Sequence, residues 1–408
     1  MVVIMGARGP LAALLGANAL SACGTAMTVL AVPWFVLQTT GSAARTGLVA
    51  GVEVFGAVVG ALAAGPVVDR VGRRAASVAS DLLAAAVVAA IPLLHGTSGL
   101  PFALLVPLAW ALGLVAAPGA TARRAMVPAL TARAEVSTER ASGAYEGVWR
   151  GARMLGGPLA GVLIALLGPP GVLLVDAATF LGSALLVRLF VPAVGGKAPG
   201  GYGHRLRGGL AYLRRDRALR WVVLLVSGTN LLDAAFFAVL LPVYAERVLG
   251  SSVALGAIAG VWAGGGLAGS LAYAWLGARL SRRWTLATAF LVSGAPRFAL
   301  LAAAPPLPMA LAALAVFGCA VGTINPVLGV VQFDRVPDDV RPVVGGVLQA
   351  GSQWPMPVGA VLAGFAVDGF GLVPTLLTAS GVYLAITLWP ALAKGWREMD
   401  EEPVGARH

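Results

Sequence analysis

Charged residues are scarce in this sequence. Asp, Glu, Lys and Arg make up 12% of the 408 residues, whereas hydrophobic residues make up 58%. A soluble chain of this length would carry roughly a quarter charged residues. The mean hydropathy is +0.85. The chain also holds repeated apolar runs of about 20 residues, which is long enough to cross a bilayer. This composition excludes an ordinary soluble protein and predicts a chain that crosses the membrane many times.

Cysteine and histidine are also rare. The two cysteines, Cys23 and Cys319, lie inside apolar runs, so the sequence predicts neither a disulfide framework nor a cysteine-rich metal site. The three histidines, His95, His204 and His408, are far apart in the chain. No phosphate-binding loop and no nucleophile elbow occurs in the sequence. We therefore expect neither an enzyme nor a built-in ATPase, and no cofactor or metal.

The charge that is present is mostly positive, with a net charge of +11. In a soluble protein this excess would suggest a nucleic-acid partner. Here the basic residues lie in both tails and in every second connection between apolar runs, whereas the alternate connections hold Arg45 and Arg247. This is the positive-inside pattern. It predicts cytoplasmic termini, a lipid-bilayer environment and no nucleic acid.

The apolar runs predict twelve helices, since a helix satisfies its own backbone hydrogen bonds in lipid. Their expected ranges are 10–37, 46–67, 75–94, 101–123, 143–167, 171–191, 220–245, 252–278, 284–303, 307–332, 344–367 and 371–392. The longest connection, 192–219, is interpreted as a cytoplasmic linker. It separates a six-helix half over 1–191 from another over 220–392, and a cytoplasmic tail follows over 393–408.

Residues 65–74 form the most specific motif in the chain. They read G-P-x-x-D-R-x-G-R-R between two predicted helices. Gly65 and Gly72 permit a tight turn, and Asp69 can pair with the arginines or lie at a helix N-terminus. This motif resembles the signature loop between helices 2 and 3 of the major facilitator superfamily of secondary transporters. The resemblance implies an all-α membrane fold of twelve helices in two pseudo-symmetric halves, alternating access around a midplane site and a monomer.

The resemblance also implies a cytoplasmic gate around this motif. The expected gate residues are Gly65, Asp69, Arg70, Gly72, Arg73, Arg74 and Asp81. Asp81 is expected to pair with the loop arginines, and Asp69 and Arg70 to contact residues 341–346. The basic part of the motif recurs at 279–283, with Ala278 where the first copy has Asp69, and this echo supports two related halves.

Further segments narrow the resemblance. They are Pro33–Leu37, Ala122–Pro128, Leu174–Phe180 and a helix-5 motif of Arg153, Gly157, Pro158 and Gly161. These segments resemble the twelve-helix drug:proton antiporters that include macrolide and siderophore exporters. Arg153 stands where many such exporters have glycine. No arginine is expected deep inside the fourth helix, because Arg123 and Arg124 are assigned to the connection that follows it.

Ionisable residues inside spans are costly and are therefore candidates for function. Asp233 lies about 20 Å along its helix, where a carboxyl group removed from water can exchange a proton. Glu53 and Asp176 are the other proton-coupling candidates. The structural alternatives are a hydrogen bond from Asn230 to Asp233, one from Gln349 or Gln353 to Glu53, and a helix N-terminus for Asp176.

Three arginines belong to the same group of intramembrane or near-membrane charges. Glu146, Arg150 and Arg153 share one helix face. They predict an ion-pair cluster or, for Arg153, a side chain that binds anionic groups in the inner cavity. Arg297 has no evident partner in the sequence and is expected to extend toward the membrane surface.

The family's central cavity implies a set of substrate-binding candidates. They share a polar or aromatic side chain in an apolar helix: Asn18, Gln38, Asn230, Phe236, Trp262, Asn325, Gln349 and Gln353. Ordinary helix packing is the alternative for each. An apolar cavity with few polar groups suits a bulky, hydrophobic ligand that is neutral or weakly charged.

Together these features predict a proton-coupled exporter of hydrophobic small molecules, a drug or a natural product, in a bacterial cytoplasmic (inner) membrane. Protonation of Glu53 or Asp233 is expected to bias the two states of the transporter. A fold does not fix the direction of transport. An importer or facilitator, a lipid flippase and a non-transporting membrane sensor therefore stay open as alternatives.

Overall fold

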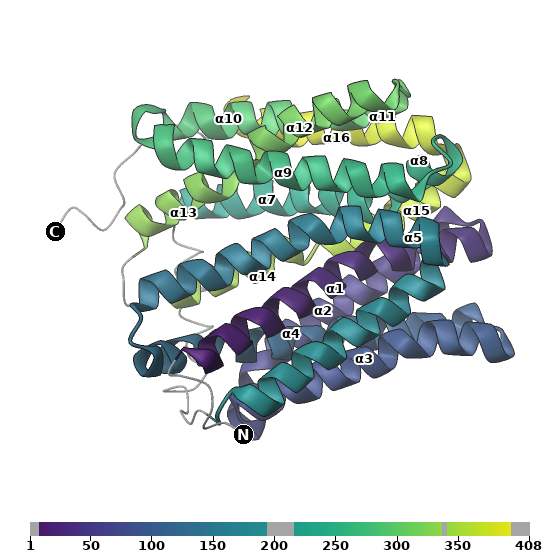
Figure 1. Cartoon of the computed structure of the whole chain (residues 1–408). Helices are drawn as coiled ribbons and strands as arrows, with labels where there is room; N and C mark the ends of the chain where they lie inside the picture. Colours follow the sequence, from purple (N-terminus) through teal and green to yellow (C-terminus); the bar gives the residue numbers. More distant parts are fainter. Residues whose placement is uncertain (1–7, 194–215, 337–340, 393–408) are drawn as a thin grey trace. The chain divides into compact units, whose positions relative to one another are not determined.

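The computed structural model describes residues 8–193, 216–336 and 341–392, and every regular element within these ranges is a helix (Figure 1). The chain divides into two compact units. The first is Met1–Pro199 with Gly250–Gly256, and the second is Gly200–Leu249 with Ala257–His408. Each unit has a buried core of its own, around Leu14 and Met126 in the first and around Leu286 and Val327 in the second. Most of the predicted linker and the predicted tail 393–408 lie outside the described residues.

Long apolar helices make up the first unit. They are α1 (Gly9–Thr40), α2 (Ala43–Val71), α3 (Arg73–Ser98), α4 (Phe102–Ala134) and α5 (Thr138–Phe190). Gly168 interrupts α5, because its φ of 71° lies in the left-handed region and Pro169 and Pro170 follow it. Accordingly, α5 contains the predicted helices 143–167 and 171–191, and the unit has six helices.

The remaining helices are shorter segments that continue one another. α7 (Arg217–Ala235), the π-helix η2 (Phe236–Leu240) and α8 (Leu241–Arg247) form one continuous run. α9 (Ser252–Leu276) ends in the 3-10 turn η3 (Gly277–Arg279). Then come α10 (Arg282–Ser293) with α11 (Ala295–Ala302), α12 (Leu307–Gly322) with α13 (Ile324–Arg335), α14 (Arg341–Gln353) with α15 (Met356–Phe370), and finally α16 (Leu372–Leu392).

The prediction of a twelve-helix membrane fold is confirmed. Within the described ranges, nine helices are long and apolar enough to cross a membrane. One of the nine is α5, which contains two predicted helices. The segmented pair α14–α15 and the helix α16, with its apolar stretch Leu372–Leu388, account for the last two predicted spans.

Two helix ends differ from the prediction. Helix 4 was expected to end at residue 123, but α4 continues to Ala134. Residues 65–74 were expected to be an open connection, but α2 extends to Val71 and only Gly72 separates it from α3. The φ of Gly72 is 90°, so this single residue makes the turn that the motif requires.

Glycines bring α2 and α4 into backbone contact. A Cβ atom on Gly113 of α4 would overlap the carbonyl oxygen of Glu53 in α2. In the same way, Cβ atoms on Gly56 and Gly60 would overlap the carbonyl oxygens of Trp110 and Leu114. Small residues allow such close approach, which is a common way to pack helices in lipid. This packing also places Glu53 of α2 beside Gly113 of α4.

We predict that Gly113→Ala lowers the thermal unfolding midpoint of the purified protein in detergent. The added methyl group has no room beside the Glu53 carbonyl, and overpacking of this kind costs about 1–3 kcal/mol. Gly143→Ala is the matched control, because nothing lies within 4 Å of the Cβ that it adds to α5. Equal midpoints for Gly113→Ala and wild type would contradict the close α2–α4 contact.

Candidate functional site

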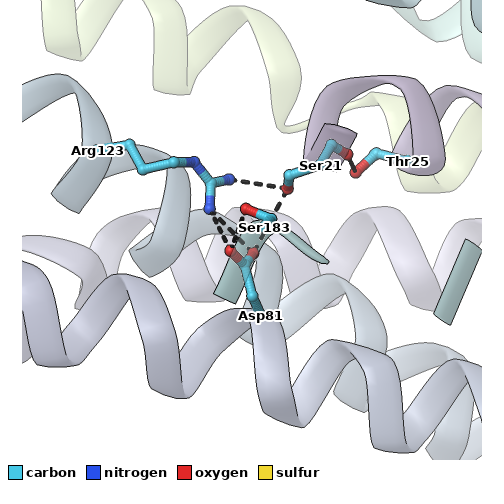
Figure 2. A network of polar contacts seen from close by, with 5 residues as sticks. All are labelled: Ser21, Thr25, Asp81, Arg123 and Ser183. Atoms are coloured by element: carbon cyan, nitrogen blue, oxygen red, sulfur yellow. Dashed lines mark hydrogen bonds and ion pairs between the residues drawn. The ribbon is translucent and has the colours of Figure 1, made fainter. Parts of the chain in front are cut away.

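A buried ion pair lies at the centre of the first unit. Asp81 of α3 accepts hydrogen bonds from Nη1 of Arg123 in α4, at 2.9 Å and 2.7 Å to its two carboxylate oxygens. The two side chains are only 5% (Arg123) and 3% (Asp81) exposed. The Ser183 hydroxyl of α5 donates to Asp81 at 2.6 Å, and Arg123 Nη2 donates to the Ser21 hydroxyl of α1 at 2.9 Å. Figure 2 shows these side chains converging from four helices.

This pair corrects two predictions. Asp81 was expected to pair with the loop arginines, but its partner is Arg123. The loop arginines bond to backbone carbonyls instead: Arg73 donates to Ala125 at 3.0 Å, and Arg74 donates to Arg188. The expectation that helix 4 holds no deep arginine was also wrong, because α4 continues for several turns beyond Arg123.

A signal in the sequence could have located Arg123. Ala122, Met126, Leu130 and Ala134 are all buried and recur every four residues, which is the spacing of one helix face. That periodicity continues through the segment that was read as a connection. The adjacent Arg124 lies in a different environment, with a side chain that is 69% exposed and paired with Glu146 at 2.6 Å.

The predicted cluster on α5 is confirmed in part. Glu146 contacts Arg150 one turn later at 3.5 Å as well as Arg124 of α4. Arg153 is not part of this cluster: its guanidinium lies 4.8 Å from the ring centre of Trp149. No ion pair to Arg153 occurs among the residues that the structure describes. Of the other helix-5 motif residues, Gly157 and Gly161 are buried in α5.

A second ion pair, with a buried arginine and a partly exposed aspartate, lies in the second unit. Arg297 of α11, whose side chain is 1% exposed, pairs with Asp233 of α7, whose side chain is 30% exposed. Four aromatic rings surround the guanidinium, with ring centres at 4.8–5.3 Å, and they belong to Phe236, Trp262, Phe298 and Tyr383. Cation–π contacts of this kind favour a charged arginine away from water.

This pair overturns the expectation that Arg297 extends toward the membrane surface. The predicted alternative for Asp233, a hydrogen bond from Asn230, is also wrong. Asn230 donates to the backbone carbonyl of Ser352 at 2.9 Å. Phe236 and Trp262, predicted to line a substrate cavity, have ring centres 4.8 Å and 5.1 Å from the Arg297 guanidinium, and their role in a cavity stays a prediction.

The remaining two acidic candidates have no cationic partner among the described residues. Asp176 of α5 is fully buried and accepts hydrogen bonds from Thr28 of α1 and, at 3.1 Å, from Thr179. Glu53 of α2 has neither a hydrogen bond nor an ion pair within the described part of the chain. Among the described contacts of these four acids, Asp81 and Asp233 are ion-paired, Asp176 is bound by hydroxyl groups, and the Glu53 carboxyl group has no partner.

Amide side chains gather around a cavity of about 360 Å³ in the second unit. α7, α13 and α14 supply its walls, and its amides are Asn230, Asn325, Gln332, Gln349 and Gln353. Four of these five were predicted cavity residues, so the structure brings half of that predicted set together. Two other candidates lie elsewhere. Asn18 is buried and donates to the backbone of Tyr145 at 3.3 Å, whereas Gln38 is exposed near the end of α1.

The gate motif is also placed, in part. Asp69 and Arg70 are exposed in the last turns of α2, and Gly65 lies in the same helix. Their predicted contact with residues 341–346 would join the two units and stays a prediction.

We predict that Asp233→Asn destabilises the protein and that Arg297→Met added to it restores part of the loss. The single change leaves a buried arginine without its counter-ion, which costs on the order of 3 kcal/mol. Thermal unfolding in detergent of both single variants and the double variant measures this coupling.

The matched control for this cycle is Asp334→Asn. Asp334 pairs with Arg282, but both side chains are nearly half exposed (47% and 46%), so its loss should cost little. Strictly additive effects of Asp233→Asn and Arg297→Met would contradict the buried pair.

Comparisons with known proteins agree with this architecture. The family model described as Major Facilitator Superfamily matches residues 14–271 and 223–406. The multidrug efflux pump Tap of Mycobacterium tuberculosis is 33% identical over 407 residues, which cover 97% of this chain and 96% of that protein. Tap of Mycolicibacterium fortuitum is 32% identical over 403 residues, covering 96% and 98%.

Solved structures show the same fold. The nucleoside transporter NupG superposes with a TM-score of 0.75 at 12% identity, covering 96% of this chain and 99% of that one. A bacterial homolog of the human lysosomal transporter Spinster gives a TM-score of 0.70 at 13% identity, covering 97% of each chain. The full-length family match and the identity to Tap establish that this chain belongs to the Major Facilitator Superfamily, as a multi-pass membrane transporter and not an enzyme.

Proposed function

We propose that this protein exports hydrophobic small molecules, drugs or natural products, by proton antiport. Two relatives that match nearly its whole length are named multidrug efflux pumps. We further propose that it acts as a monomer in a bacterial cytoplasmic (inner) membrane, with cytoplasmic termini and halves at 1–191 and 220–392. The observation that carries the coupling mechanism is the unpaired carboxyl group of Glu53.

Proton coupling requires an acid that can gain and lose a proton within the membrane. Asp81 and Asp233 each pair with an arginine and therefore already serve as its counter-ion. Asp176 accepts hydrogen bonds from the hydroxyl groups of two threonines, which hold its carboxyl group in place. The Glu53 side chain has neither kind of partner in the described ranges, so gain or loss of a proton there breaks no ion pair or hydrogen bond. We assign the transported proton to Glu53.

The amide-lined cavity is the proposed substrate contact of the second half. Its described lining includes the apolar residues Val222, Val226 and Leu348 beside the amides and contains no charged residue. Amides donate and accept hydrogen bonds without imposing a charge on the ligand. Such a surface suits a neutral or weakly charged hydrophobic molecule and tolerates different orientations of polar groups.

The motif at the end of α2 is the proposed cytoplasmic gate. Asp69 and Arg70 are exposed there and would contact the second half near residues 341–346 when the cytoplasmic side is closed. The single-residue turn at Gly72 keeps this end of α2 directly connected to α3, which carries Asp81 of the buried ion pair. Movement at the gate would therefore act on the junction of four helices around Asp81 and Arg123.

We predict that Glu53→Gln abolishes uphill transport. Inside-out vesicles that contain the protein would accumulate a fluorescent hydrophobic drug when the lumen is acidic. In Glu53→Gln, accumulation should fall to the level without a pH gradient, because glutamine cannot bind and release a proton. Substrate exchange without a gradient should persist, since the amide keeps the size of the side chain.

Glu139→Gln is the matched control, because Glu139 is an exposed acid in the first turn of α5. Asp176→Asn tests the second candidate in the same assay. Wild-type accumulation by Glu53→Gln would exclude Glu53 as the carrier. If wild-type flux were independent of the gradient, the facilitator alternative would replace antiport.

A further inference from the structure

A second cavity lies in the first unit, away from the proposed substrate surface. Its volume is about 810 Å³, and the first turns of α3 and the last turn of α5 form its walls. Its described lining contains Arg73, Arg74 and Arg188 and no acidic residue. Neither the gate nor the coupling mechanism uses the Arg188 side chain.

Two of these arginines are held in place by the backbone. Arg73 donates one hydrogen bond to the carbonyl of Ala125, and Arg74 donates one to the carbonyl of Arg188. A guanidinium carries five N–H donors, so each retains donors for another ligand. No carboxylate pairs with any of the three in the part of the chain that the structure describes. The cavity is therefore a positive site with no counter-ion from its own described walls.

The start of α3 adds backbone donors to the same cavity. Its N-cap is Gly72, which has no side chain, and no side-chain hydrogen bond caps this helix. The N–H groups of Arg73, Arg74 and Ala75 belong to the first turn, where helix geometry offers them no partner. The positive end of the helix dipole and the arginines thus favour the same kind of ligand, an anion with several acceptor oxygens.

The other walls of the cavity are apolar. Ala75, Val78, Ala79 and Leu82 follow one face of α3, and Leu189 lies on α5. The Leu82 side chain is 45% exposed. A small soluble anion needs no such apolar stripe beside its binding groups. A molecule with an anionic head and a hydrocarbon tail matches both parts of the cavity.

We propose that this cavity binds one acidic phospholipid. The phosphate would accept hydrogen bonds from Arg74, Arg188 and the first turn of α3, and an acyl chain would lie along Val78 and Leu82. Basic pockets beside membrane helices are suited to anionic head groups. The bound lipid would contact both the first turn of α3, next to the turn at Gly72, and the last turn of α5.

Binding of short-chain phosphatidylglycerol to the purified full-length protein in neutral detergent tests this proposal. Native mass spectrometry counts the bound lipid, and a titration gives the affinity. We expect one phosphatidylglycerol per chain and an affinity that falls roughly tenfold or more in Arg74→Gln/Arg188→Gln, because charge-assisted hydrogen bonds are lost. Arg133→Gln/Arg140→Gln removes the same charge from exposed positions and should bind as wild type does.

Three further arms identify the ligand. Phosphatidylcholine should bind weakly, because its head group has no net charge. Millimolar inorganic phosphate should not displace phosphatidylglycerol. Leu82→Glu leaves every arginine in place but puts a carboxylate on the apolar wall, and it should also weaken lipid binding.

Unchanged affinity in both Arg74→Gln/Arg188→Gln and Leu82→Glu would overturn the proposal. Full displacement by inorganic phosphate would show a free-anion site and would overturn it equally. If Arg74→Gln/Arg188→Gln does not fold, the Leu82→Glu result decides alone. The binding measurement requires no transport, so its outcome is independent of the proposed export function.

Discussion

A charge inside a bilayer must find its counter-ion within the protein, and this constraint organises both units of the structure. Water is not available there, and an isolated ion in hydrocarbon is costly. In the described part of each unit, a buried arginine pairs with an aspartate. In the first, Arg123 and Asp81 join two helices and draw in serines from two more. In the second, Arg297 pairs with Asp233 inside a set of aromatic rings. The surroundings of the two pairs differ chemically: serine hydroxyl groups surround the first, and aromatic ring faces surround the arginine of the second. In both pairs the aspartate serves as the counter-ion of the arginine.

The sequence predicts the helices better than it predicts these partners. Apolar runs report the length of a span directly, so most helices lie close to their expected ranges, and the breaks fall at residues such as Gly168 with Pro169. The exception is α4, which continues to Ala134 beyond its apolar run. The ion-pair partners could not be predicted in this way, because they are far apart in the sequence. Asp81 and Arg123 are 42 residues apart, and Asp233 and Arg297 are 64 apart. In helices that are apolar on nearly every face, periodicity does not show which side meets which neighbour. The four cavity amides could be selected as polar residues in apolar helices, but their convergence depends on the packing of α7, α13 and α14.

Charged side chains that lack a counter-ion within the described residues are candidates for binding a proton or a ligand. Within the described chain, Glu53 is a carboxyl group in a span without a hydrogen bond or counter-ion, at a height fixed by the glycine contact of α2 with α4. At the end of the same helix, the arginines after Gly72 border a cavity whose described lining contains no acid. A proton would neutralise the Glu53 carboxyl group. A bound anion would neutralise the arginines of the cavity. Both assignments follow from the same requirement for electrical neutrality in lipid.

If Glu53 carries the transported proton, binding of a drug should release that proton. Purified protein in weakly buffered detergent, near neutral pH, is mixed with a transported drug while a pH-sensitive dye reports free protons. We expect release from the wild-type protein and none from Glu53→Gln, although the variant still binds the drug. Equal proton release from both proteins would exclude Glu53 as the carrier and would assign the coupling to another acid.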